Sequence, residues 1–167
     1  MNRKDFFIAA CPTLIAGYFA AALSSCSKEK EADVTPPATT ETEISKIKAL
    51  FNASGIYAAG KTIYIDLKNS FFSKIKMNEN FINLTENGVL ILRINDKYFA
   101  FDNCCPHQGS SNVWEYNNSK FRCKNHGNVY GIDKTGTAEC SSNRTFGNLK
   151  NFDVTIVEQD YLKIVKP

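Results

Sequence analysis

The sequence has little excess charge and few residue patterns of the kind that enzymes use. Its formal net charge is +3, and Lys and Arg are scattered without runs or interleaved aromatics, so a nucleic-acid partner is not expected. It contains no nucleophile–base pair and no phosphate-binding loop, so the chain is not predicted to be an enzyme on its own. No segment repeats, which excludes a repeat architecture. Histidine is also scarce, with only two in 167 residues.

Both of those histidines lie beside cysteines. Cys105 and His107 are separated by one residue, Cys123 and His126 by two, and fifteen residues lie between the two pairs. Two short loops would therefore supply two thiolates and two imidazoles. Such a set predicts one metal centre, with these four residues as its ligands.

The N-terminus has the features of an export signal. A basic start is followed by the uncharged apolar stretch 6–23 and by small residues before Cys26, which is typical of a secretory signal. The last four residues of this segment resemble the lipobox of bacterial lipoproteins, in which the cysteine is acylated. We therefore expect a signal peptide over 1–25, a lipid anchor on Cys26 and a place on a membrane outside the cytoplasm. A single transmembrane helix is the alternative, although Pro12 and Gly17 interrupt the stretch.

A linker and one domain are predicted to follow. Residues 26–43 are rich in charge, Thr and Pro and almost lack large apolar residues, so they indicate an extended, solvated linker. The domain is expected over 44–167. Ile44 and Ile47 recur at helical spacing, which predicts a short opening helix.

After that helix, short strands are predicted. Apolar residues alternate with polar ones over 62–67, run almost continuously over 89–94 and return over 98–102 after a turn at Asn95-Asp96. Further strands are expected over 120–123, 129–133, 154–157 and 161–165. Many short strands separated by turns indicate an all-β antiparallel sandwich or barrel. Trp114 and Phe121 are expected in its core, and Gly109 and Gly127 in tight loops.

The Cys-Pro-His and Cys-x-x-His motifs resemble the Rieske iron–sulfur family, with the specific part over 105–130. The resemblance implies one [2Fe-2S] cluster in a small cluster-binding subdomain. Cys105 and Cys123 would bind one iron, and His107 and His126 the other, at the exposed edge. Two neutral imidazoles in place of thiolates make the centre less negative, which raises its potential to roughly −150 to +300 mV.

The residues around the ligands depart from the high-potential members of that family. Those members place a serine two residues after the second histidine and a tyrosine four residues after it; here the positions hold Asn128 and Tyr130. They also join the two loops by a disulfide, but the matching positions here are Ser110 and Asn125. We therefore expect a potential below that of a quinol-oxidising subunit.

The family assigns no ligand role to the other two cysteines of the domain. Cys104 borders the first loop, and Cys140 lies where a cluster-covering segment usually runs. Outside the cytoplasm, free thiols tend to oxidise. A Cys104–Cys140 disulfide and two buried free thiols are the two alternatives.

Three functional interpretations remain open. The first is a membrane-tethered electron-transfer protein with redox protein partners, and the second an electron-transfer subunit of a membrane oxidoreductase. The third is a structural zinc module, although zinc fingers usually keep like ligands together. A terminal oxygenase is disfavoured because both histidines are already used, which leaves none for a 2-His-1-carboxylate iron site.

Overall fold

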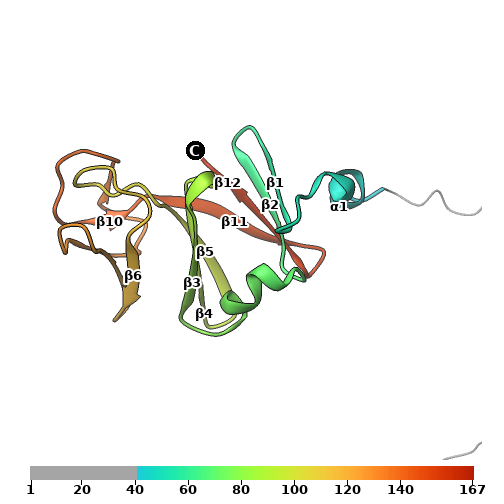
Figure 1. Cartoon of the computed structure of the whole chain (residues 1–167), viewed down its shortest axis with the longest axis horizontal. Coiled ribbons are helices and arrows are strands. Elements are labelled where there is room, and N and C mark those ends of the chain that lie inside the picture. Colours follow the sequence, from blue (N-terminus) through green and yellow to red (C-terminus); the bar gives the residue numbers. More distant parts are fainter. Residues whose placement is uncertain (1–40) are drawn as a thin grey trace, which may run out of the picture. The chain divides into compact units, whose positions relative to one another are not determined.

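The computed structural model describes residues 41–167, all of which belong to one compact unit (Figure 1). The predicted signal peptide, the predicted lipidation site Cys26 and most of the predicted linker lie outside the described residues. Within 41–167, no helix has the length and apolar character that crossing a membrane would require.

The described chain opens with a short capped helix, α1 (Glu43–Ile47), followed by a 3₁₀ turn over Lys48–Leu50. The hydroxyl oxygen of Thr42 accepts a hydrogen bond from the Ser45 amide at 3.2 Å, which satisfies one of the free amides at the helix start. Ile44 is buried against two tyrosines of the sheet. The helix predicted from Ile44 and Ile47 is therefore present.

The main element is a curled seven-stranded antiparallel sheet with the order β1-β2-β12-β11-β5-β4-β3. Its strands are β1 (Ile56–Ala59), β2 (Thr62–Asp66), β3 (Asn80–Leu84), β4 (Val89–Ile94), β5 (Lys97–Asp102), β11 (Asn151–Val157) and β12 (Tyr161–Val165). A 3₁₀ segment over Ser70–Lys76 connects β2 to β3, and another over Thr85–Asn87 connects β3 to β4. Figure 1 shows the long β11 running between the β1–β2–β12 part and the β3–β4–β5 part. The predicted all-β class is confirmed.

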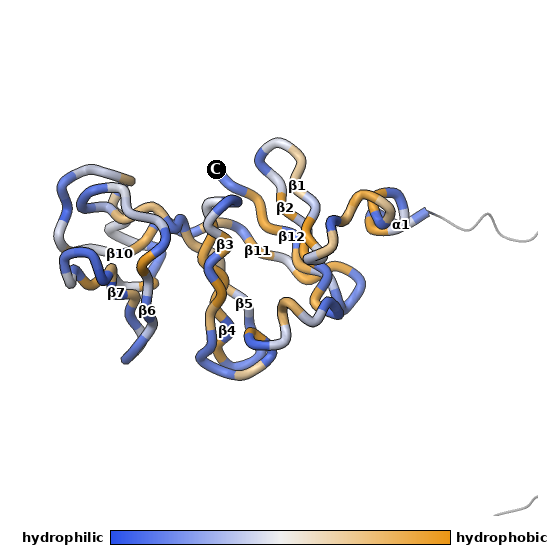
Figure 2. Tube along the Cα trace, viewed as in Figure 1, coloured by the Kyte–Doolittle hydropathy of each residue, from blue (hydrophilic) through white to orange (hydrophobic). Residues whose placement is uncertain are grey.

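The strand β4 explains where the two cores of the domain lie. Val89 and Ile91 pack into the core inside the curled sheet. Leu90 and Leu92, on the opposite face, pack into a second core with the cysteine-bearing loops. Because both faces are covered, the strand is apolar along most of its length, as the hydropathy colouring also shows (Figure 2).

Beyond β5 the chain forms a smaller subdomain. A three-stranded antiparallel sheet contains β6 (Trp114–Asn117), β7 (Lys120–Cys123) and β8 (Val129–Tyr130), and a parallel pair contains β9 (Thr137–Ala138) and β10 (Asn148–Leu149). β8 ends earlier than the predicted 129–133 strand. It ends because the amide and carbonyl of Gly131 bond to Gly147 and Leu149 instead of continuing the ladder.

Phe121 fastens this subdomain to the main sheet. Its side chain is fully buried, with 0% exposed. Four other aromatic rings surround it at centroid distances of 5.0 to 6.2 Å: Tyr116, Phe81, Phe101 and Trp114. Phe81 and Phe101 belong to β3 and β5, so the contact joins the two sheets. Trp114 and Phe121 are core residues, as predicted.

Candidate metal centre

Two loops with the same backbone design carry the cysteines and histidines. They cover residues 105–110, after β5, and 123–128, between β7 and β8. In each loop the amide of the first residue donates to the carbonyl of the last residue, at 2.9 Å in both. The amide of the fifth residue, Gly109 or Gly127, donates back to the carbonyl of the first at 2.8 and 2.9 Å. These glycines have φ of 75° and 76°, a conformation that other residues rarely adopt.

The first residue of each loop is a buried cysteine. Cys105 and Cys123 are each 1% exposed, and neither is in a disulfide. Burial raises the pKa of the Cys123 thiol, and the neighbouring Cys105 raises it further. The two sulfur atoms therefore lie in a buried environment where a thiolate needs a cation beside it. A bound metal supplies this positive charge, and its binding would release the thiol protons.

The two histidines also lie together, on the outer side of the loops. The ring centroids of His107 and His126 are 4.8 Å apart, with the planes at 89°. His126 is exposed and His107 is half-buried. The Nδ1 atom of His107 is buried and has no hydrogen-bond partner. A buried polar atom without a partner is costly, and a metal bond at this nitrogen would satisfy it.

A hydrogen bond joins the two loops. The side-chain amide of Asn125 donates to the hydroxyl of Ser110 at 2.8 Å. At these two positions the high-potential members of the resembled family have the disulfide that joins their loops, which Ser110 and Asn125 cannot form. A neutral hydrogen bond near the surface is weaker than a covalent bond, contributing about 1 kcal/mol.

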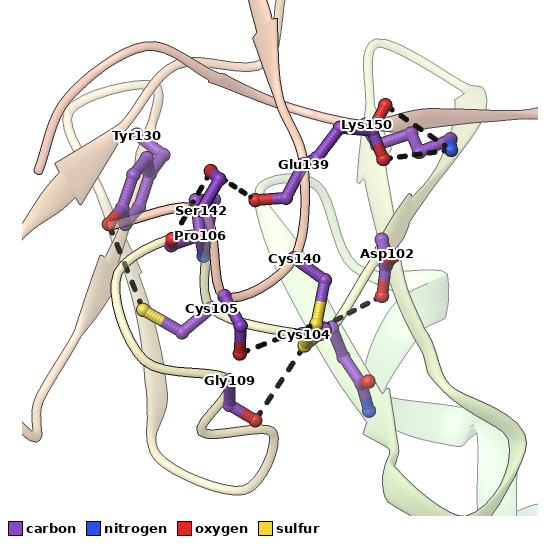
Figure 3. The surroundings of a disulfide bond; sticks show 12 residues. Asp102, Cys104, Cys105, Pro106, Gly109, Tyr130, Glu139, Cys140, Ser142 and Lys150 are labelled. Atoms are coloured by element: carbon purple, nitrogen blue, oxygen red, sulfur yellow. Dashed lines mark hydrogen bonds and ion pairs between the residues drawn. A yellow bond between two sulfur atoms is a disulfide. The ribbon is translucent and has the colours of Figure 1, made fainter. Parts of the chain in front are cut away.

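A third segment covers the first loop, and we call residues 139–144 the strap (Figure 3). A disulfide between Cys104 and Cys140 attaches it, with Cα atoms 5.3 Å apart. The amide of Ser141 donates to the Cys105 carbonyl, and the amide of Arg144 donates to the Pro106 carbonyl, both at 3.3 Å.

Side chains fasten the strap further. The Ser142 hydroxyl lies 2.6 Å from the Glu139 carbonyl and 3.4 Å from the Pro106 carbonyl. The Glu139 carboxylate pairs with Lys150 at 3.1 Å. The strap is thus held both to the first loop and to Lys150, the residue between β10 and β11.

Tyr130 and Asn128, the two residues singled out beside the ligands, are both near the centre. The Tyr130 side chain is fully buried, and its hydroxyl lies 3.8 Å from the Cys105 sulfur. The same hydroxyl donates to the Arg144 carbonyl at 2.7 Å. Burial raises the pKa of Tyr130, and Cys105 raises it further, so the hydroxyl keeps its proton. The side-chain nitrogen of Asn128 is buried and has no partner.

Sequence reasoning missed a polar connection that places the first loop. Asn103 is 2% exposed, and its side-chain amide donates to the Asn83 side chain of β3 at 2.9 Å. Asn83 donates to the carbonyl of Ser111 at 2.7 Å, and the Trp114 indole donates to the Asn103 carbonyl at 2.7 Å. This network fixes both ends of the loop to the main sheet. No signal in the sequence distinguishes these asparagines from surface ones.

The donor set, two thiols and two imidazoles, is one that a two-iron centre can use. A cluster with two irons needs only two protein ligands at each iron, because its sulfides complete the coordination. A buried thiol pair and a separate histidine pair match that requirement.

Comparison with known proteins gives the family. The model of the Rieske [2Fe-2S] domain matches residues 66–153, which is more than half of the chain. No curated protein matches the sequence.

Several solved structures resemble the chain at low identity. The ferredoxin of carbazole 1,9a-dioxygenase from Nocardioides aromaticivorans is 16% identical, with a TM-score of 0.42, and the match covers 57% of this chain and 93% of that one. The plasma membrane Rieske protein of the cyanobacterium Synechocystis is 19% identical, with a TM-score of 0.36 and coverage of 54% and 87%. The terminal oxygenase of carbazole 1,9a-dioxygenase from Nocardioides aromaticivorans is 17% identical, with a TM-score of 0.40, and the match covers 55% of this chain but only 28% of that one.

The family model spans the two loops, the aromatic core around them and the strands β3, β4 and β5 of the main sheet. The predicted cofactor, one [2Fe-2S] cluster, is the group that this domain binds. The chain therefore belongs to the Rieske [2Fe-2S] family, whose domain binds one such cluster and transfers electrons.

Proposed function

We propose that Cys105 and Cys123 bind one iron of the cluster and that His107 and His126 bind the other. The observation that carries this proposal is the matched pair of loops, each with a buried cysteine first and a left-handed glycine fifth. The unpartnered Nδ1 of His107 supports it. When bound, the cluster supplies a centre that accepts and returns one electron.

The protein's own residues would place and insulate that centre. The aromatic side chains around Phe121 exclude water from the cysteine side. His126, which is exposed, forms the side from which an electron can leave. Lys124 follows the ligand Cys123, and Arg144 is the last residue of the strap. Both are exposed, and neither forms an ion pair among residues 41–167. These charges favour a redox partner with an acidic face.

We propose that the whole protein is a one-electron carrier tethered to a membrane outside the cytoplasm. The lipobox-like segment before Cys26 and the charged, Pro-containing stretch 27–43 support a lipid anchor with a spacer. Replacing Cys26 by Ser is expected to move the protein from the membrane fraction to the soluble fraction. Retention in the membrane with an uncleaved N-terminus would instead support a transmembrane anchor.

The experiment that tests the centre uses the full chain purified from membranes in mild detergent. We expect two irons and two sulfides for each chain, visible absorption bands, and a reduced-state EPR signal. Cys123→Ser and His126→Leu should each abolish them, while the exposed Asn117→Ala should leave them unchanged. A colourless, EPR-silent protein with one zinc would show a zinc module instead. Stoichiometric co-purification with a catalytic chain would identify an oxidoreductase subunit.

A further inference from the structure

The Tyr130 hydroxyl has one proton and two acceptors within reach. A tyrosine hydroxyl can donate only one hydrogen bond. Its oxygen lies 2.7 Å from the carbonyl oxygen of Arg144, a normal hydrogen-bond distance, and 3.8 Å from the Cys105 sulfur. The proton is therefore directed to the backbone carbonyl, and the sulfur has the more distant contact.

The position of the Tyr130 side chain is fixed by its surroundings. The side chain is held on all sides, being fully buried in the aromatic core, with the Trp114 ring centroid at 6.0 Å. The group that accepts the hydrogen bond of the Tyr130 hydroxyl therefore depends on what the neighbouring backbone places beside it.

The strap presents that acceptor. Arg144 is its last residue, and the Arg144 amide is bonded to the first loop at Pro106. At the other end, the Cys104–Cys140 disulfide attaches the strap to the residue before Cys105 (Figure 3). The Ser141 amide, next to Cys140, bonds the Cys105 carbonyl. The Arg144 carbonyl thus stays beside Tyr130 as long as both ends of the strap are fastened.

We propose that the strap lowers the reduction potential of the cluster by holding the Tyr130 hydroxyl on Arg144 and away from the Cys105 sulfur. Cys104 and Cys140 act as positioning residues in this device, and the proposal rests on Cys105 being a cluster ligand. A donor to a ligating sulfur stabilises the reduced, more negative centre, so withholding it favours the oxidised state. The expected potential, below that of a quinol-oxidising subunit, would then depend partly on a disulfide outside the ligand set.

The device can be opened chemically. A dithiol reagent would transfer two electrons and two protons to the disulfide, giving two thiols and its own cyclic disulfide. Cys140 is exposed, so its sulfur is the accessible point of attack. With the strap unfastened, the Tyr130 hydroxyl can turn to the Cys105 sulfur, and the potential rises.

The test is a double-mutant cycle on the cluster-loaded full chain, read by EPR-monitored redox titration. It compares wild type, Tyr130→Phe, the Cys104→Ser/Cys140→Ser variant and all three changes together. Opening the strap should raise the equilibrium constant for reduction by about tenfold, which is about 59 mV for one electron. Tyr130→Phe should have less than about a twofold effect in wild type but should abolish the gain in the open-strap variant.

Two further measurements keep the outcomes distinct. Amide hydrogen exchange at Ser141 and Arg144 should become faster in the open-strap variant, which shows that the strap is released. Thr145→Ala, a change at an exposed residue just outside the strap, serves as the matched control. It should alter neither the reduction potential nor the rate of amide exchange. If the serine variant does not load a cluster, wild type is loaded first, then reduced with a phosphine, alkylated, and titrated.

Two results would overturn the proposal. One is a Tyr130→Phe effect as large in wild type as in the open-strap variant, because Tyr130 would then already donate to Cys105. The other is an unchanged potential although hydrogen exchange shows that the strap is released. Absence of any cluster in the wild-type protein would instead contradict the proposed function, and the iron and sulfide content reports that separately.

Discussion

Replacing Phe121 by alanine should separate the cluster-binding subdomain from the main sheet. The side chain is 0% exposed and is surrounded by four aromatic rings from β3, β5 and β6. Truncating a buried Phe to Ala costs about 3 to 5 kcal/mol, because the lost apolar contacts leave a cavity. A domain is stabilised by only about 5 to 15 kcal/mol in total, so this loss is a large part of it.

Urea denaturation of the cluster-loaded protein measures this loss. At a urea dependence of about 2 kcal/mol per M, a loss of about 4 kcal/mol lowers the midpoint by about 2 M. Trp114 is the only tryptophan of the chain, and its ring centroid lies 6.2 Å from that of Phe121. Its fluorescence therefore reports on the subdomain, while visible absorption reports on the cluster.

The matched control is the same chemical change at Phe71, which is 48% exposed. Phe71→Ala should cost at most about 1 kcal/mol and leave the visible bands unchanged. Equal midpoints for the two variants would refute the role given to the aromatic core. So would loss of the cluster from Phe121→Ala at a urea concentration no lower than for wild type.

Three other predictions concern smaller contributions. Asn125→Ala removes the hydrogen bond to Ser110, worth about 1 kcal/mol, so the cluster should be lost to a chelator roughly fivefold faster, as followed by visible absorption; the exposed Lys124→Ala should not change that rate. The pKa of Glu43 is lowered by its hydrogen bonds from Lys163 and from a tyrosine hydroxyl, so this carboxylate stabilises the fold above the ordinary glutamate pKa near 4.5 and the stabilisation is lost as the pH falls below it. Glu43→Gln should therefore flatten the pH dependence of the urea midpoint below pH 5, and an unchanged slope would contradict the assignment. Lys124→Glu should slow electron exchange with a flavodoxin, which is an acidic carrier, and speed exchange with cytochrome c, which is a basic one, and both effects should become smaller in salt. If wild type and the variant exchange electrons with each carrier at the same rate, this face has no docking role.

Local sequence patterns predicted the strands in which apolar and polar residues follow a regular order. The alternation over 62–67 and the continuous apolar run over 89–94 correspond to β2 and β4. The strands β3 and β6 were not predicted, because asparagines interrupt β3 and polar residues flank the short β6. Their strand conformation comes from pairing with β4 and β7 rather than from local preference.

The arrangement around the cluster was only partly foreseeable. Cysteine first and glycine fifth in each loop are local features, because the closing hydrogen bonds lie within six residues. The Asn125–Ser110 hydrogen bond spans 15 residues, and the Tyr130–Arg144 hydrogen bond spans 14. Neither pairing has a sequence signature, since each depends on where a second loop is placed in space.

The sequence by itself determined the cofactor family, the all-β class and the positions of the two thiol–imidazole pairs, because spacing within a short loop controls which side chains can face one cluster. The tertiary structure decided how those loops are joined and what covers them. It joined the two loops by a hydrogen bond between Asn125 and Ser110, and of the two alternatives for Cys104 and Cys140 it has the disulfide. It also gave the proton of Tyr130 to a backbone carbonyl of the strap. Those contacts bring together residues that only the folded chain makes neighbours.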